Sequence, residues 1–200
     1  MKKTKKILFA SSNKGKIEEV RQILIPLGYE IIPQSELDVP DVDETGLSFI
    51  ENAILKARHC AAITGLPSLA DDSGLAVAAL DGAPGIYSAR YAGNHGDHAA
   101  NIAKLLTEME TIPDGRRQAS FECLMVYIRH ENDPLPMIAH GSWQGEILRA
   151  AKGNRGFGYD PVFYVPEFKC SAAELDSSAK NNISHRALAL RQLQRLLKFA

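Results

Sequence analysis

Hydrophobic residues recur in two spacings along this chain, and near the N-terminus they predict a strand, a loop and a helix. The run Ile7–Ser11 is apolar until its polar end, as a short buried strand is. Within Lys16–Leu27 the apolar side chains lie three or four positions apart, which is the spacing of a helix with one buried face. Gly28 ends this helix, and Tyr29–Pro33 follows as a second strand.

A second predicted helix follows a loop rich in Pro and Asp. The run Ser48–Glu51 has the spacing of a capping box, and it opens a helix that continues to about Thr64. Two further short strands are predicted at residues 69–70 and 75–80. Between them, Asp71-Asp72-Ser73-Gly74 consists of turn-forming residues, and this composition predicts a sharp corner.

The second half of the chain continues the alternation of helices and strands. A helix from Asp97 or His98 to Glu110 follows a loop rich in Gly and Pro. The remaining predicted elements are the strand Gln118–His130, its hairpin partner Met137–Leu148, the strand Val162–Val165, a capping box at Ser171–Glu174 and a final helix from Ser184 to Phe199. Because the sequence contains no linker or repeat, these elements predict one α/β domain over residues 1–200 with a mixed sheet.

Composition and charge exclude several classes of protein. The 200 residues are 45% hydrophobic and 24% charged, which excludes a disordered or fibrous chain. The net charge of −1 argues against binding to a nucleic-acid polymer, and no stretch approaches the roughly 20 apolar residues of a membrane span. The basic start MKKTKK precedes too short an apolar run for an export signal. Cys60, Cys123 and Cys170 are far apart and indicate buried, reduced thiols in a cytoplasmic protein.

Phosphate-binding chemistry is concentrated in the polar loop Ser11-Ser12-Asn13-Lys14-Gly15-Lys16. This loop leaves a predicted strand and enters a helix, whose free N–H groups and positive dipole end favour an anion. It is not a Walker A loop, because it lacks the first glycine and has Ile17 in place of Ser or Thr. The alternative interpretation is a polar turn that Asn13 shapes.

Two acidic segments are candidates for a metal site. Asp71 and Asp72 stand at a predicted strand end, and Asp43 and Glu44 precede the helix that carries Lys56. Mg²⁺ usually takes one or two carboxylates together with waters and phosphate oxygens, so one carboxylate from each segment is sufficient. Taken singly, each segment also fits a simpler interpretation, as a turn in the first case and as a favourable helix start in the second.

Cationic residues near the C-terminus indicate an anionic or acceptor-rich ligand. Lys180, His185 and Arg186 gather around the start of the last predicted helix, where the helix dipole disfavours positive charge. A surface cluster is the alternative. By contrast, Gly153–Gly158 has the wrong glycine order for a dinucleotide fingerprint, and His95–His98 lies in a polar loop without the spacing of a zinc site.

Short motifs along nearly the whole chain resemble one family, the pyrophosphatases of noncanonical purine nucleoside triphosphates such as inosine and xanthosine triphosphate. Each motif is weak alone, but their number and order are specific. They are Ser12-Asn13-Lys14-Gly15-Lys16, Glu44-Thr45-Gly46, Phe49-Ile50-Glu51-Asn52-Ala53 with Lys56-Ala57, Ala70-Asp71-Asp72-Ser73-Gly74-Leu75, Gly82-Ala83-Pro84-Gly85, Ser88-Ala89-Arg90-Tyr91, Gly156-Phe157-Gly158-Tyr159-Asp160-Pro161 and Ser184-His185-Arg186.

The resemblance implies a fold, an assembly and a reaction. The fold is an elongated mixed β-sheet flanked by helices, in two lobes with a central active-site cleft, and the assembly is a homodimer. The reaction is Mg²⁺-dependent hydrolysis between the α- and β-phosphates of dITP, ITP, XTP or dXTP. It gives a monophosphate and pyrophosphate, and so cleanses the nucleotide pool.

The resemblance also implies roles for individual residues. Asp72 is the general base and a metal ligand, and Glu44, preferred over Asp43, is the second metal ligand. Arg90 reaches either phosphate or the dimer interface. The residues expected to bind substrate are Ser11, Ser12, Asn13, Lys14, Gly15, Lys16, Lys56, Ser73, Phe157, Gly158, Tyr159, Asp160, Lys180, His185 and Arg186. Two alternatives stay open, a pyrophosphatase for pyrimidine or modified nucleotides on a related fold and a nucleotide-binding module without turnover.

Overall fold

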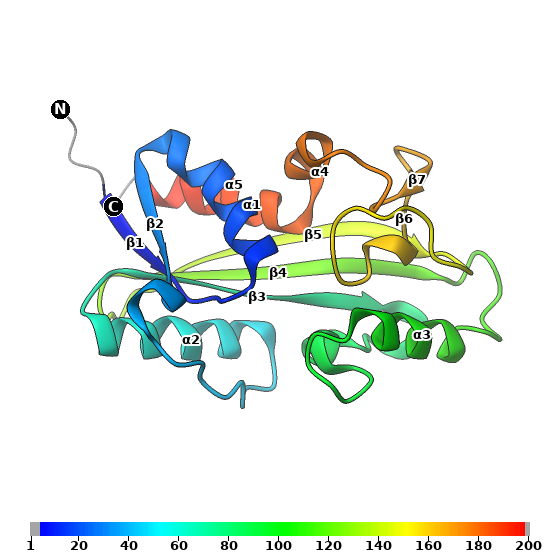
Figure 1. The fold of residues 1–200 in the computed structure, drawn as a ribbon, viewed down its shortest axis with the longest axis horizontal. Coiled ribbons are helices and arrows are strands. Elements are labelled where there is room, and N and C mark those ends of the chain that lie inside the picture. The colour runs from blue at the N-terminus through cyan, green and yellow to red at the C-terminus, as the bar shows by residue number, and fades with distance from the viewer. Residues whose placement is uncertain (1–4, 199–200) are drawn as a thin grey trace. The chain divides into compact units, whose positions relative to one another are not determined.

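Seven strands form one mixed sheet in the computed structural model, which describes residues 5–198 (Figure 1). Their order across the sheet is β2-β1-β3-β4-β5-β6-β7. Strand β1 pairs in parallel with β2 and β3, whereas β6 pairs antiparallel with β5 and β7. The strands are β1 Lys5–Phe9, β2 Tyr29–Pro33, β3 Ser68–Val77, β4 Gln118–Ile128, β5 Met137–Ile147, β6 Phe163–Val165 and β7 Cys170–Ser171. The predicted α/β class with a mixed sheet is confirmed.

The helices α1 to α4 each begin after a polar residue whose side chain accepts a hydrogen bond from the backbone three residues further on. These N-cap residues are Asn13, Ser48, Asp97 and Asp176, and each satisfies an N–H group that the helix start leaves without a partner. The α-helices are α1 Lys14–Leu24, α2 Phe49–Thr64, α3 His98–Glu108, α4 Ser177–Ile183 and α5 His185–Leu197. Short 3-10 helices cover Ile25–Leu27, Gln34–Leu37, Ala78–Leu80, Gly85–Arg90 and Asp160–Val162. Within residues 5–198, no helix combines the length and apolar content needed to cross a membrane.

The described residues divide into two compact units. The first comprises residues 5–72, 123–141 and 186–198, and the second comprises residues 73–122 and 142–185. The single domain expected over residues 1–200 stays a prediction. Residues 1–4 of the basic start, and the predicted end of the last helix at Phe199, lie outside the described residues.

The first unit buries both faces of its part of the sheet. Alternate residues of a strand point to opposite faces, so Ile7 and Phe9 pack with apolar residues of α1 and α5, whereas Leu8 packs with the alanines of α2. Figure 1 shows α1 and α5 on one face of β1 and α2 on the other. A strand buried on both faces reads as a continuous apolar run, which is the pattern from which β1 was predicted.

The second unit packs α3 and the 3-10 helix Asp160–Val162 against the strand segments that it contains. Its core includes the aromatic side chains of Phe121, Trp143 and Phe163, and the Phe121 and Phe163 ring centroids lie 4.6 Å apart. The buried guanidinium of Arg117 donates to the carbonyl oxygens of Met109 and Ile147, at 2.6 and 2.7 Å. This arginine thereby caps the C-terminal end of α3 and ties it to β5.

Strand β3 is continuous, so the predicted corner at Asp71-Asp72-Ser73-Gly74 is wrong. The strand runs from Ser68 to Val77 without a turn. Asp71 is 1% exposed and Asp72 is 6% exposed, whereas turn residues normally lie at the surface. Ion pairs on both faces of the strand allow these acids to be buried, and a composition-based prediction contains no information about such partners.

The C-terminal region also differs from the prediction. Glu174 Oε2 does accept a hydrogen bond from Ser171 N at 2.7 Å, but no helix begins there. Helix α4 begins instead at Ser177, and its presence was not predicted. Ser184 lies between α4 and α5, and its N–H donates to Lys180 O at 2.9 Å.

The cysteines are free thiols, in agreement with the predicted reduced state. Cys60 and Cys123 are buried as expected, but Cys170, on the two-residue strand β7, is only partly buried. Burial raises the pKa of Cys60 to about 11. A thiol with so high a pKa is a weak nucleophile at neutral pH.

Candidate active site

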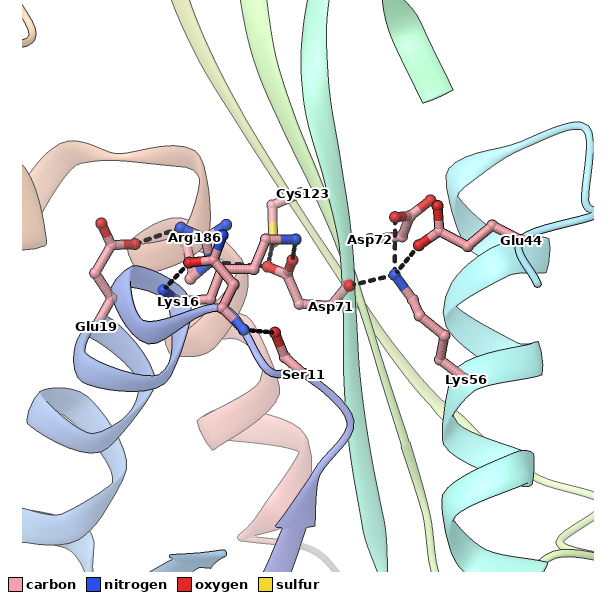
Figure 2. A network of polar contacts seen from close by, with 10 residues as sticks. Ser11, Lys16, Glu19, Glu44, Lys56, Asp71, Asp72, Cys123 and Arg186 are labelled. Atoms are coloured by element: carbon pink, nitrogen blue, oxygen red, sulfur yellow. Dashed lines mark hydrogen bonds and ion pairs between the residues drawn. The ribbon is translucent and has the colours of Figure 1, made fainter. Parts of the chain in front are cut away.

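Neighbouring aspartates on β3 lie in two different polar networks. Because successive side chains of a strand point to opposite faces, Asp71 faces α1 and α5 and Asp72 faces α2. Figure 2 shows Asp71 directed toward Lys16 and Arg186, and Asp72 directed toward Lys56. One step along the strand therefore separates two sites of different chemistry.

Lys56 is the centre of the network on the α2 face. Its Nζ donates to Asp72 Oδ1 at 2.9 Å, to Glu44 Oε1 at 2.8 Å and to the backbone oxygen of Asp71 at 2.8 Å. Glu44 belongs to the segment before α2, whereas the neighbouring Asp43 is exposed. The structure therefore brings together three residues predicted from sequence, and it places Glu44 rather than Asp43 at the cluster.

Burial and charge adjust the proton affinity of this cluster. Burial raises the pKa of the Asp72 carboxyl, and the nearby negative charge of Glu44 raises it further, against the opposing effect of Lys56. For Lys56, burial lowers the pKa, but the charges of Asp72 and Glu44 outweigh it and raise the pKa. A carboxylate with a raised pKa is a stronger base, which suits it to accept a proton from water.

The cluster has an unfilled acceptor that fits a cation. Asp72 Oδ2 is buried and has no hydrogen-bond partner among residues 5–198. A buried carboxylate oxygen without a partner is costly, and binding of a metal ion would satisfy it. Because Mg²⁺ needs only one or two carboxylates when phosphate oxygens and waters complete its shell, Asp72 and Glu44 fit this ion.

On the opposite face of β3, Asp71 is enclosed by cations. It forms an ion pair with Lys16 and a second with Arg186, in which Arg186 Nε lies 2.8 Å from Asp71 Oδ2. It also accepts a hydrogen bond from Cys123 Sγ at 3.1 Å. Burial by itself would raise the pKa of Asp71, but the charges of Arg186 and Lys16 outweigh it and hold the pKa well below its usual range. Arg186 also pairs with Glu19.

The polar loop at the start of α1 has the conformation of a helix cap. Ser11 Oγ accepts from Asn13 N at 3.2 Å, and Asn13 Oδ1 accepts from Lys16 N at 3.1 Å. Ser12 Oγ accepts a hydrogen bond from Gln34 Nε2 at 3.2 Å. Ser12, Asn13 and Lys14 are exposed beside the positive end of the helix, as an anion site requires. Their binding of phosphate stays a prediction.

In the second unit, Asp160 organises the residues predicted to bind the base. Its Oδ2 accepts from Lys180 Nζ at 2.6 Å and from Phe157 N at 2.8 Å, and the Lys180 Nζ lies 4.9 Å from the centre of the Phe157 ring. A Cβ on Gly156 would lie 2.0 Å from Asp160 Oδ2, and Gly156 has φ of +74°. Only glycine therefore fits at this position.

The other candidates of the second unit differ in their surroundings. The His185 ring stacks on Phe121 with centroids 4.9 Å apart and planes 13° apart. Tyr159, predicted to bind substrate, is buried, and its hydroxyl donates a hydrogen bond to Ser88 O at 2.9 Å within the second unit. Arg90 lies over the Tyr87 ring at 5.3 Å. Gly158 and Ser73 are partly buried.

Several residues of these networks were not predicted. Cys123 and Glu19 are distant in sequence from Asp71 and Arg186 and join them only in the folded chain, and Asp71 itself was expected at a metal site, not in this network. Period-two alternation through Asp71 and Asp72 was the one available signal, since it places adjacent residues of a continuous strand on opposite faces. Phe121 and Gln34 carry no sequence signal beyond their positions in or beside a strand.

Known proteins match this chain over almost its whole length. The sequence profile of the Ham1 family matches residues 7–196. The chain belongs to the Ham1 family. Its solved relatives include a HAM1 protein from Coxiella burnetii, which is 52% identical, with a TM-score of 0.91 over 98% of this chain and 100% of the other.

Curated relatives of this Ham1 protein have a consistent name. The protein from Photorhabdus laumondii named dITP/XTP pyrophosphatase is 54% identical, and the match covers 98% of this chain and 99% of the relative. A protein of the same name from Haemophilus ducreyi is 56% identical, with 96% and 98% covered.

The lowered pKa of Asp71 predicts a loss of stability in acid. A carboxyl whose pKa is lowered by folding stabilises the protein above its unfolded pKa, near 3.8, and this contribution is lost as the pH falls below that value. We expect Asp71→Asn to be less stable than the wild type at pH 7, with a difference that shrinks toward pH 3. Urea unfolding across this range measures it, and a constant difference would contradict the lowered pKa.

Proposed function

We propose that this chain is a dITP/XTP pyrophosphatase that hydrolyses noncanonical purine nucleoside triphosphates to the monophosphate and pyrophosphate. The observation that carries the proposal is the cluster of Glu44, Lys56 and Asp72, in which a buried carboxylate oxygen lacks a partner. Relatives more than half identical over nearly full length, whose name states this activity, support it.

We propose that Asp72 and Glu44 hold Mg²⁺. When bound, this ion supplies positive charge that polarises phosphate oxygens and lowers the pKa of water. Asp72 is buried and Glu44 is half-buried, and Lys56 lies within hydrogen-bond distance of each. The lysine balances the two negative charges and keeps them close together.

The residues of this chain then have separate tasks in the hydrolysis. Asp72 accepts the proton of the attacking water, since it is the buried carboxylate of the cluster. Lys56 and Lys16 offset the negative charge of the phosphates, as fixed cations do in phosphoryl transfer. The loop Ser11–Lys16 orients phosphate at the N-terminus of α1.

Base selection follows from the donors of the second unit. Arg186, which the resemblance also assigns to substrate binding, is 1% exposed and is paired with Asp71 and Glu19 in the first unit. Phe157 presents an aromatic face, and Lys180 and His185 carry N–H donors. Hypoxanthine and xanthine have a 6-keto acceptor, whereas adenine has an amino donor there. Donors that face a donor remain unpaired, which costs several kcal/mol and rejects ATP. We also propose a homodimer, as the family resemblance implies, and a cytoplasmic location, as the free cysteines indicate.

A substrate panel tests the proposed activity. Purified protein with Mg²⁺ is incubated separately with dITP, XTP, ATP, GTP, dUTP and dTTP, while monophosphate, pyrophosphate and orthophosphate are measured. We expect kcat/KM for dITP and XTP to exceed that for ATP by at least about 100-fold, with pyrophosphate as the released product, and to exceed that for GTP as well. Faster turnover of dUTP or dTTP would favour a pyrimidine enzyme, and binding without turnover would favour a nucleotide-binding module.

Replacement of Asp72 tests its role as the base. We expect Asp72→Asn to lower kcat for dITP by about 100-fold or more, because the amide can neither accept the proton nor bind Mg²⁺ as a carboxylate does. The matched control is Asp43→Asn, which removes an exposed carboxylate close in sequence but outside the cluster, and it should leave kcat within about twofold. Near-normal turnover by Asp72→Asn would remove this residue from the reaction.

A further inference from the structure

Glu44 lies in a segment that has no regular secondary structure. Residues 38–48 contain no helix or strand, yet the carboxylate of Glu44 reaches Lys56 at 2.8 Å. A side chain on an irregular segment is held in place only as well as its backbone is. The contacts that anchor this segment therefore decide whether Glu44 faces the cluster.

The segment is attached to α2 immediately after Glu44. Gly46 N donates to Asn52 Oδ1 at 2.8 Å, and one residue later Leu47 N donates to Glu51 Oε2, also at 2.8 Å. A Cβ on Gly46 would lie 2.6 Å from Glu51 Cβ and 2.7 Å from Asn52 Oδ1. The backbone thus approaches the first turn of α2 so closely that a side chain at Gly46 would push it away.

Asn52 lies on the same face of α2 as Lys56, because residues four apart in a helix are neighbours. One turn of the helix therefore carries the amide that holds the backbone near Glu44, and the next carries the ammonium that binds its carboxylate. The two contacts fix the segment and its side chain from one rigid element.

The side-chain amide of Asn52 is buried, and its oxygen accepts a hydrogen bond while its nitrogen donates none within the described residues. Asn52 is 0% exposed, and its Nδ2 has no hydrogen-bond partner among the described residues. The hydrogen bond from Gly46 N requires the Asn52 oxygen at that position, since a flipped amide would place its NH₂ group against the Gly46 N–H donor. A buried donor without a partner is destabilising, so packing alone does not explain an asparagine at this position.

We propose that Asn52 is a positioning residue that sets the affinity of the metal site by holding the backbone beside Glu44. The inference rests on the proposed function, since it takes Glu44 as a metal ligand. Residues that orient metal ligands through hydrogen bonds typically change metal affinity by about 10- to 100-fold when they are replaced. Asn52 touches neither substrate nor metal, and it acts through Gly46 and Glu44.

Binding of Mn²⁺, followed by electron paramagnetic resonance without nucleotide, tests the proposal. We expect Asn52→Ala to weaken Mn²⁺ binding about tenfold. Gly46→Ala should weaken it to a similar extent, because the added methyl group separates the segment from α2 while Asn52 remains. The matched control is Thr64→Ala, which removes a side-chain hydrogen bond at the other end of α2, and it should leave Mn²⁺ affinity within about twofold.

A double-mutant cycle with Glu44→Gln separates the possible outcomes. If Asn52 acts through Glu44, Asn52→Ala should weaken Mn²⁺ binding no further in the Glu44→Gln background. Additive losses, or an effect of Asn52→Ala no larger than that of Thr64→Ala, would overturn the positioning role and leave the metal site intact. Unchanged Mn²⁺ affinity in Glu44→Gln itself would instead overturn the proposed metal site.

Discussion

The alternation of side chains along β3 is the constraint on which the candidate chemistry depends. Asp71 and Asp72 are consecutive and both buried, yet they face different helices because the strand continues through them. Asp71 is surrounded by the cations Lys16 and Arg186, so its negative charge is compensated within the protein. Asp72 shares Lys56 with Glu44 and retains an oxygen that has no hydrogen-bond partner among residues 5–198. The Asp71 carboxylate is therefore paired within the protein, whereas the Asp72 carboxylate has an acceptor that a ligand could use.

This division explains why the two carboxyls have opposite pKa shifts. Compensating charge lowers the pKa of Asp71, which therefore stays ionised and holds α1 and α5 to the sheet. Burial beside a second carboxylate raises the pKa of Asp72, so its ionised form is destabilised and reactive. Functional sites commonly retain such under-compensated groups at the expense of stability. The segment that carries Glu44 needs separate anchoring because it lies outside the sheet, and Gly46 and Asn52 provide it.

Local signals predicted much of this structure, and long-range contacts account for the errors. The capping box at Ser48 located the start of α2, and β2 was predicted with its observed ends, because these features depend on neighbouring residues. The corner at Asp71 was wrong because turn-forming composition was the only local signal, while burial of the acids depends on Lys16 and Arg186, which are far away in sequence. Glu44, Lys56 and Asp72 were expected at one site by resemblance, and the structure places them together. The network around Asp71 was missed because it joins four separate elements.

The most direct test compares the unfolding free energies of Asp71→Asn and Asp72→Asn at pH 7 in metal-free buffer. Asp71→Asn removes the partner of the buried Arg186 and the partly buried Lys16, and should lose about 3 kcal/mol or more. Asp72→Asn removes a charge whose pKa is raised by folding, so its stability should stay within about 1 kcal/mol of the wild type or exceed it. Equal losses in the two variants, or a larger loss in Asp72→Asn, would contradict the division of structural and catalytic roles between the two faces of β3.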